Sequence, residues 1–229
     1  MAGDSAPHSS QDDDRISLAE YTSRISEIHH RVKNNFQVII SLFGLQADQT
    51  TDPQMLETLT EMQNRVRAIA YLHEPLYSID NFSTIHFGDY LDTFVHELHA
   101  LYSGAASRIQ LQLSLADLAL DAADAVPLAL ICNELVWNAF KHAFPDNRCG
   151  KVSVALRYAS GTPGYESQFC ELQIVDDGIG LPQGADVMTA ESLGFHIVRA
   201  LTHQLQGTIE VHSGTGGTSF LVAFPLARQ

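Results

Sequence analysis

A long amphipathic segment near the N-terminus limits most strongly the folds that this chain can adopt. From about Ile16 to Gln46, apolar residues recur at roughly the 3.5-residue spacing of a heptad repeat, which predicts one long helix. Such a helix buries its apolar seam against other helices. With Leu18 at heptad position a, the a and d positions are Leu18, Tyr21, Ile25, Ile28, Val32, Asn35, Ile39, Leu42 and Gln46.

A second helical pattern follows after a short break at residues 50–52. Asp52 is expected to cap the new helix and Pro53 to occupy its first position, because both residue types favour these places. Two long helices with a short connection predict an antiparallel hairpin. A hairpin alone cannot bury both apolar stripes, so we expect a homodimer whose two hairpins form a four-helix bundle. The alternative is an intramolecular bundle completed by the next helix of the chain.

The rest of the chain mixes alternating segments with helical ones. This mixture predicts an α+β fold in which helices cover one face of a mostly antiparallel sheet, a two-layer α/β sandwich. We expect residues 1–15, rich in Ser and Asp, to be a disordered tail or linker, residues 16–80 to form the helical domain, and residues 84–228 to form the second domain. The expected strands are 108–115, 151–158, 169–175, 208–211 and 218–224, and the expected helices are 87–102, 126–143 and 192–205.

Composition excludes some classes of protein. The net charge is −14 and the pI about 5.0, whereas nucleic-acid binders usually present a basic face. No apolar run approaches the roughly 20 residues that span a bilayer, and no secretory signal is evident. The three cysteines form no Cys-x-x-Cys pair and indicate reduced thiols. We therefore expect a cytoplasmic protein without a direct membrane span or a nucleic-acid partner.

The helix expected over 126–143 carries a polar stripe. Glu134, Asn138 and Lys141 have the spacing i, i+4 and i+7, which places them on one helix face. A carboxylate and a carboxamide suit Mg²⁺, and an ammonium suits phosphoryl oxygens. The alternative is an ordinary exposed polar face with one ion pair.

Three glycine-containing turns follow that helix. Asp176–Gly180 comes at the end of an expected strand, where a carboxylate can face a buried base edge and glycines let a ligand approach the backbone. Ser192–Gly194 precedes a helix whose free N–H groups can hold phosphates. Gly214–Thr218 joins the last two expected strands. Each turn alone is a weak signal, because Asp-Gly turns and capped helices are common.

Taken in order, these segments resemble the GHKL family of ATPases, which includes the catalytic domains of histidine kinases. The resemblance covers about residues 124–225. Residues 133–145 resemble the N box of the family, and residues 176–180, 192–198 and 214–218 resemble its glycine-containing boxes. The resemblance implies a Bergerat-type ATP-binding fold.

The helix that opens the chain gains a meaning from this resemblance. Residues 27–37 resemble the phosphoacceptor box of bacterial sensor histidine kinases, in the branch related to the HWE group, where the acceptor is the His directly before Arg. That residue is His30. The heptad independently places His30 at position f, opposite the apolar seam, while His29 lies on its flank. The alternative for His30 is a plain surface histidine.

The resemblance implies an ATP-dependent kinase that phosphorylates His30 and passes the phosphoryl group to an aspartate of a response-regulator receiver domain. It implies Mg²⁺ held by Asn138 and Glu134, with Glu134 also orienting or deprotonating His30, and Lys141 contacting phosphate. It further implies a sensor domain or a separate sensory partner outside this chain. The residues implied to bind ATP are Asn138, Lys141, His142, Asp176, Gly178, Gly180, Leu193, Gly194 and Thr218.

Two other functions fit the same pattern. A histidine phosphotransferase would keep His30 but have a weak or inactive ATP site. A scaffold that docks a regulator would need neither ATP nor His30. Nucleotide binding separates the active kinase from the phosphotransferase and the scaffold.

Overall fold

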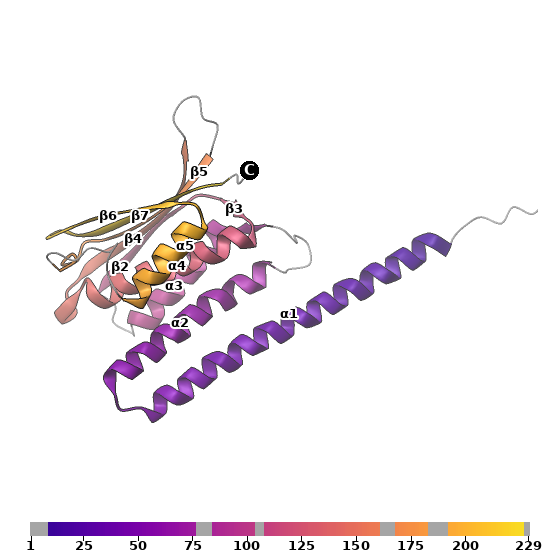
Figure 1. Cartoon of the computed structure of the whole chain (residues 1–229), viewed down its shortest axis with the longest axis horizontal. Coiled ribbons are helices and arrows are strands. Elements are labelled where there is room, and N and C mark those ends of the chain that lie inside the picture. The colour runs from indigo at the N-terminus through magenta and orange to yellow at the C-terminus, as the bar shows by residue number, and fades with distance from the viewer. Residues whose placement is uncertain (1–8, 77–83, 104–107, 161–167, 183–191, 227–229) are drawn as a thin grey trace, which may run out of the picture.

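The computed structural model describes residues 9–76, 84–103, 108–160, 168–182 and 192–226. Within these ranges an N-terminal helical hairpin lies beside three helices that cover one face of a five-stranded sheet (Figure 1). The expected α+β class, with a hairpin followed by a helix-covered sheet, is confirmed.

The hairpin consists of α1 (Ser9–Gln49) and α2 (Pro53–Leu76). Its turn forms as expected, because Asp52 Oδ1 accepts a hydrogen bond from the Gln54 N–H at 2.9 Å and so caps α2. Gln63 Nε2 donates to the backbone oxygen of Ile40 at 3.0 Å. This contact fixes which levels of the two helices lie opposite each other.

The expected start of α1 was wrong. The helix begins at Ser9 rather than near Ile16, so residues 9–15 belong to α1. The apolar heptad pattern begins near Ile16, but a helix can extend beyond its apolar seam. Residues 1–8 lie outside the described part of the chain.

The main sheet has the strand order β2-β4-β5-β7-β6. β2 and β4 pair in parallel and the other neighbours are antiparallel, as expected of a mostly antiparallel sheet. A short pairing of β1 with β3 was not foreseen. The bounds are β1 Ile85–His86, β2 Ile109–Leu115, β3 Ala119–Leu120, β4 Gly150–Ser160, β5 Gln168–Asp176, β6 Thr208–Gly214 and β7 Gly217–Pro225.

Alternate residues of the three central strands form the core. Leu156 on β4 lies opposite Leu172 on β5, and Leu172 lies opposite Val222 on β7. All three are at most 1% exposed. Because side chains alternate across a strand, the even-numbered positions of these strands bury one face against the helices. The buried positions are Val152, Val154, Leu156, Cys170, Leu172, Ile174, Phe220, Val222 and Phe224.

The helix layer contains α3 (Phe87–Ser103), α4 (Ala122–His142) and α5 (Leu193–Gln204). α4 begins at Ala122, earlier than the expected start at residue 126. The N-cap is Asp121, whose Oδ1 accepts from the Asp124 N–H at 3.0 Å. Pro127 therefore lies inside the helix and not at its first position.

The hairpin contacts the second domain through α2. The hydroxyl of Tyr90 on α3 donates to the backbone oxygen of Ala68 at 3.2 Å, and the rings of Tyr71 and Phe94 lie 6.3 Å apart. Ala68 is fully buried. α2 thus lies between α1 and the helix layer, as Figure 1 also shows. This position brings side chains of α2 to the edge of the second domain.

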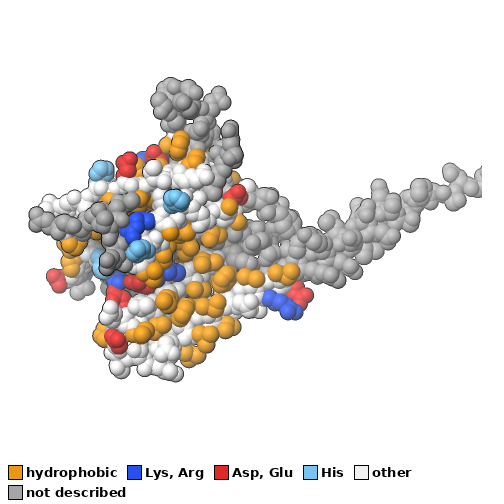
Figure 2. Space-filling view, viewed as in Figure 1, with side chains coloured by type: hydrophobic (Ala, Val, Ile, Leu, Met, Phe, Trp, Pro, Cys, Tyr) orange, Lys and Arg blue, Asp and Glu red, His pale blue; other side chains and the backbone are white. Residues whose placement is uncertain are grey.

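Apolar side chains remain exposed along the hairpin. Figure 2 shows hydrophobic atoms gathered over it. On α1 the half-buried positions that face α2 include Val32, Phe36, Ile40 and Phe43, while a neighbouring stripe stays open. The exposed apolar residues of the hairpin are Ile28, Val38, Ile39, Leu42, Leu45, Met55 and Leu56. In the described ranges, no helix combines the length and the apolar character needed to cross a membrane.

Candidate functional site

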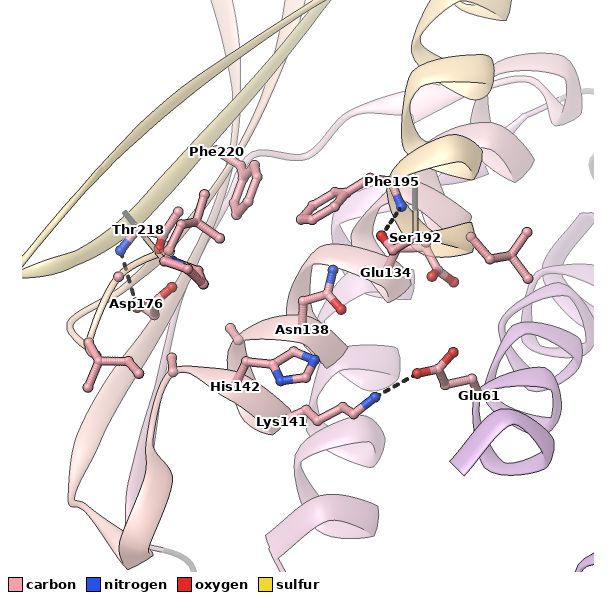
Figure 3. A pocket seen from close by; sticks show the side chains of 18 of the residues that line it. Glu61, Glu134, Asn138, Lys141, His142, Asp176, Ser192, Phe195, Thr218 and Phe220 are labelled. Atoms are coloured by element: carbon pink, nitrogen blue, oxygen red, sulfur yellow. Dashed lines mark hydrogen bonds and ion pairs between the residues drawn. The ribbon is translucent and has the colours of Figure 1, made fainter. Parts of the chain in front are cut away.

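One stripe of α4 forms the floor of a cavity (Figure 3). Glu134, Asn138 and Lys141 follow one another at the spacing expected from the sequence, and His142 comes directly after them. The opposite side of α4 is packed in the core, where Ala129, Cys132 and Val136 are fully buried. α4 is therefore held in place by its apolar side and presents its polar stripe to the cavity.

Glu134 is buried and paired with a residue of the hairpin. Its side chain is 5% exposed. Arg65 on α2 donates from Nε to Oε1 and from Nη2 to Oε2, both at 2.8 Å, and Asn133 Nδ2 donates to Oε1 at 3.1 Å. Burial lowers the pKa of Arg65. The hydrogen bonds and negative charges of Glu134 and Glu61 raise this pKa by more, so the overall shift is upward. The result is a bidentate, charge-assisted contact between the two domains.

Lys141 is also paired with α2. Its Nζ lies 2.8 Å from Glu61 Oε1 and also contacts the carboxylate of Glu57. Burial lowers the pKa of Lys141, and the hydrogen bonds and charges of both glutamates raise it by more. Contact with Lys141 lowers the pKa of Glu57. The side chain that resemblance assigns to phosphate thus lies between two carboxylates.

His142 lies beside these charges. Its pKa is lowered by partial burial and by the nearby charge of Lys141, which together exceed the opposing effect of Glu57 and Glu61. The imidazole is therefore held mainly neutral at neutral pH.

Asp176 closes the other side of the cavity at the end of β5. Its Oδ1 accepts hydrogen bonds from the Gly178 N–H at 2.9 Å and the Thr218 N–H at 3.2 Å. Burial raises the pKa of Asp176, and these hydrogen bonds oppose the rise. Because Oδ1 is occupied by the backbone, Oδ2 is the oxygen left for a ligand. The Asp-Gly turn therefore fixes the orientation of the carboxylate.

Two glycines of this turn are required by close contacts. A Cβ at Gly178 would overlap the backbone oxygen of Ala143 at the end of α4, so a side chain there would separate β5 from α4. Gly180 has a φ of +76°, a conformation that L side chains rarely adopt, and faces Gly214. Gly178 supports the cavity from behind and is absent from its lining, while Gly180 lines it.

The start of α5 forms a third wall. Ser192 caps the helix by accepting from the Phe195 N–H at 3.5 Å. A Cβ at Gly194 would lie 2.8 Å from Glu134 Oε2, so glycine lets α5 approach this carboxylate closely. The rings of Phe195 and Phe220 lie 6.1 Å apart and face the cavity in Figure 3.

These walls enclose a cavity of about 600 Å³. It unites most residues that the sequence analysis assigned to nucleotide and metal binding. The expected residues that line it are Glu134, Asn138, Lys141, His142, Asp176, Gly180, Leu193, Gly194 and Thr218, and the further lining residues are Glu61, Arg65, Ala139, Ala143, Ile179, Leu181, Pro182, Ser192, Phe195 and Phe220.

Glu61 and Arg65 were missed because they belong to the hairpin. A signal was present in the sequence: Glu57, Glu61 and Arg65 recur at four-residue spacing and so share one face of α2. No role was assigned to that face from the sequence. The docking of α2 on α4 gives it a different role.

The backbone of His30 lies at another level of the hairpin than the cavity. This residue belongs to α1, and its side chain is outside what the structure describes. Ile40 contacts Gln63, which lies between Glu61 and Arg65 on α2. His30 precedes Ile40 by ten residues, or about 15 Å along the helix. The cavity therefore faces a level of the hairpin well away from His30.

Two comparisons with protein families agree with this geometry. Residues 27–102 match the family described as "Histidine kinase", and residues 123–228 match the "Histidine kinase-, DNA gyrase B-, and HSP90-like ATPase" family. This chain belongs to the sensor histidine kinases. The second match places the cavity in a domain of an ATP-binding family.

Individual histidine kinases support this assignment. The sensor histidine kinase PdtaS of Mycolicibacterium smegmatis is 34% identical over 224 residues, which cover 94% of this chain and 42% of PdtaS. The blue-light-activated histidine kinase 2 of Erythrobacter litoralis is 26% identical over 214 residues, which cover 92% of this chain and 59% of that protein. The chain therefore spans less than half the length of PdtaS.

Solved structures confirm the fold. The histidine kinase domain of the Erythrobacter litoralis EL346 blue-light activated histidine kinase aligns with a TM-score of 0.65 and 25% identity, covering 91% of this chain and 96% of that domain. The Acinetobacter baumannii histidine kinase AdeS aligns with a TM-score of 0.53 and 17% identity, which supports the fold alone.

Proposed function

We propose that this chain is an autophosphorylating kinase that binds Mg·ATP in the α4 cavity and phosphorylates His30. One observation carries the proposal: a single cavity unites the polar stripe of α4 with Asp176 and the start of α5, in a chain whose hairpin presents a histidine-kinase acceptor sequence. The phosphoryl group then passes to an aspartate of a response regulator. The input comes from a sensor domain or a separate sensory partner.

The two ends of the cavity suit the two ends of ATP. The remaining oxygen of Asp176 accepts a hydrogen bond from the adenine amino group, and Thr218 lies next to it. The glycine-lined turns let the backbone approach the nucleotide. At the other end, the N-terminus of α5 at Leu193 and Gly194 provides free N–H groups for phosphate. Lys141 adds a positive charge there, and His142 flanks the nucleoside.

The residues at the phosphate end fit a divalent cation. Glu134 and Asn138 lie one turn apart on α4 and both line the cavity, so a carboxylate and a carboxamide oxygen can converge on one ion. When bound, Mg²⁺ supplies charge neutralisation for the phosphate oxygens. This fit requires Glu134 to be released from Arg65.

The reaction follows from these positions. A nitrogen of the His30 imidazole attacks the γ-phosphorus in line, an N–P bond forms, and the bond to the β,γ-bridging oxygen breaks to release ADP. Glu134 orients the imidazole or accepts its proton. Charge neutralisation by Lys141 and accurate positioning supply most of the rate enhancement. Since the cavity faces another level of the hairpin, the ATP-binding domain must move before transfer.

The exposed apolar stripe on α1 supports a homodimer. Ile28, Ile39 and Leu42 belong to the predicted seam and are 57%, 39% and 58% exposed in the single chain. A second hairpin packed on this stripe would bury these side chains and complete a four-helix bundle. Val32 differs, because it is half-buried on the side that faces α2.

Incubation of the purified protein with γ-labelled ATP tests the proposed activity. Phosphohistidine is acid-labile and base-stable, so the label should be lost in acid and retained in base. His30→Gln should abolish the label while nucleotide binding and the folded state persist, since a position opposite the seam carries little packing. His29→Gln is the matched control and should retain most of the label. Loss of label in the His29 variant alone would assign the acceptor to His29.

Asp176→Asn should weaken ATP binding about ten- to a hundredfold. Asparagine keeps the oxygen that accepts from Gly178 and Thr218, but it turns an NH₂ group toward the adenine amine, and an unpaired buried donor costs about 1–3 kcal/mol. Asp177→Asn is the control, because Asp177 Oδ1 accepts from the Lys151 N–H at 2.6 Å and an amide oxygen can do the same. Calorimetry with a non-hydrolysable ATP analogue measures both. Equal affinities would remove Asp176 from the adenine site.

Replacing Ile39 and Leu42 together with Asp should shift the protein from dimer to monomer, because a dimer would bury both charges. Ser41→Asp adds a charge at an exposed position beside the stripe and should leave the dimer intact. Light scattering coupled to size exclusion reports the mass of each variant. An unchanged dimer in the double variant would exclude this stripe as the interface.

A further inference from the structure

The helix α2 holds both charged residues of the α4 stripe at once. Arg65 is paired with Glu134, while Glu57 and Glu61 are paired with Lys141. Arg65 also lies 3.5 Å from Glu61, so the pairs are joined. We call these five residues the α2–α4 ion-pair cluster. Every charge that α4 presents here has an opposite charge facing it from α2.

The arrangement is too specific for an incidental surface contact. The side chains of Arg65 and Glu134 are only 13% and 5% exposed, and their two parallel hydrogen bonds are both 2.8 Å long. Removing one partner of such a buried pair leaves the other charge buried and uncompensated, which is strongly destabilising. Arg65 and Glu134 therefore depend on each other in this position. The ion pairs also follow one another regularly along the two helices: residues 57–65 of α2 contact residues 134–141 of α4 in reverse order.

The cluster occupies the groups that the reaction needs. Both carboxylate oxygens of Glu134 accept from Arg65, and the guanidinium charge opposes the approach of a cation or an imidazolium to the same carboxylate. The charge of Lys141 is balanced by Glu57 and Glu61, which reduces its attraction for phosphate. The same contact holds the cavity about 15 Å along the hairpin from the level of His30. Binding of substrate and approach to His30 therefore both require this cluster to open.

We propose that Arg65 is a positioning residue that withholds Glu134 from the reaction until the α2–α4 ion-pair cluster opens. This inference rests on the proposed kinase function and adds a resting state to it. Arg65 competes with the substrate-bound cation for one carboxylate, and Glu57 and Glu61 compete with phosphate for Lys141. A signal that rotates or shifts α2 would change the cluster directly, because α2 belongs to both the hairpin and the cavity wall.

Arg65→Gln provides the first test, since glutamine keeps much of the side-chain size without the charge. If about nine-tenths of the molecules are closed, opening should raise the apparent affinity for a non-hydrolysable Mg·ATP analogue about tenfold. The Mg²⁺ concentration that gives half-maximal analogue binding should fall by a similar factor, and the initial rate of His30 labelling should rise. A purely structural role for Arg65 would not lower the Mg²⁺ requirement.

Arg67→Gln is the matched control. Arg67 lies two residues further along α2, and its Nη1 donates to Asn64 Oδ1 at 3.3 Å, outside the cluster. This variant should bind the analogue as the unchanged protein does. Arg65→Lys, which keeps the charge but cannot form both parallel hydrogen bonds, should fall between the unchanged protein and Arg65→Gln.

A second variant protects the test if Arg65→Gln is poorly folded. Glu61→Gln leaves the Arg65–Glu134 pair in place and weakens mainly the hold on Lys141, together with the longer 3.5 Å contact to Arg65, so it should raise analogue affinity by a smaller factor, about two- to fivefold. Circular dichroism and thermal melting verify that each variant is folded.

The possible results separate the two proposals. Tighter binding and a lower Mg²⁺ requirement in Arg65→Gln support the withholding role. If the unchanged protein binds the analogue and Arg65→Gln binds it equally or more weakly, the withholding role is overturned while the kinase proposal stands. If neither protein binds the analogue, the kinase proposal fails and the inference about Arg65 fails with it.

Discussion

The packing of α4 between the sheet and α2 is the constraint on which the site depends. Its apolar side is anchored in the core by Ala129, Cys132 and Val136, and its polar side carries Glu134 and Lys141 into the cavity. The same polar residues bind α2 through ion pairs. One helix therefore fixes the core, the cavity floor and the orientation of the hairpin, so a change in any of these is transmitted to the other two.

Much of the site could be predicted from the sequence because its signals are local. The spacing of Glu134, Asn138 and Lys141 places them on one face of any helix they form, and an Asp-Gly turn after an alternating strand places Asp176 at a strand end. The Asp52 cap and the buried alternation of the central strands were predictable for the same reason. The roles assigned to these residues in nucleotide binding and catalysis remain predictions.

The features that could not be predicted depend on contacts between distant segments. Arg65 and Glu134 are 69 residues apart, and nothing in either helix alone shows that they meet. The heptad pattern likewise could not divide α1 into the side that faces α2, with Val32, and the stripe that stays open, with Leu42. The start of α4 was misplaced because the true cap, Asp121, was not recognised from the sequence.

Nucleotide binding and phosphoryl transfer depend on different residues of one cavity, and Glu134→Gln tests this division most directly. Glutamine keeps the shape of the side chain but removes the charge that orients or deprotonates the imidazole. Analogue affinity should stay within a few fold of the original value, or rise as the pair with Arg65 weakens, while the initial rate of His30 labelling falls about 10²–10⁴-fold. Labelling at the original rate with unchanged affinity would contradict the account and leave Glu134 with a structural role only.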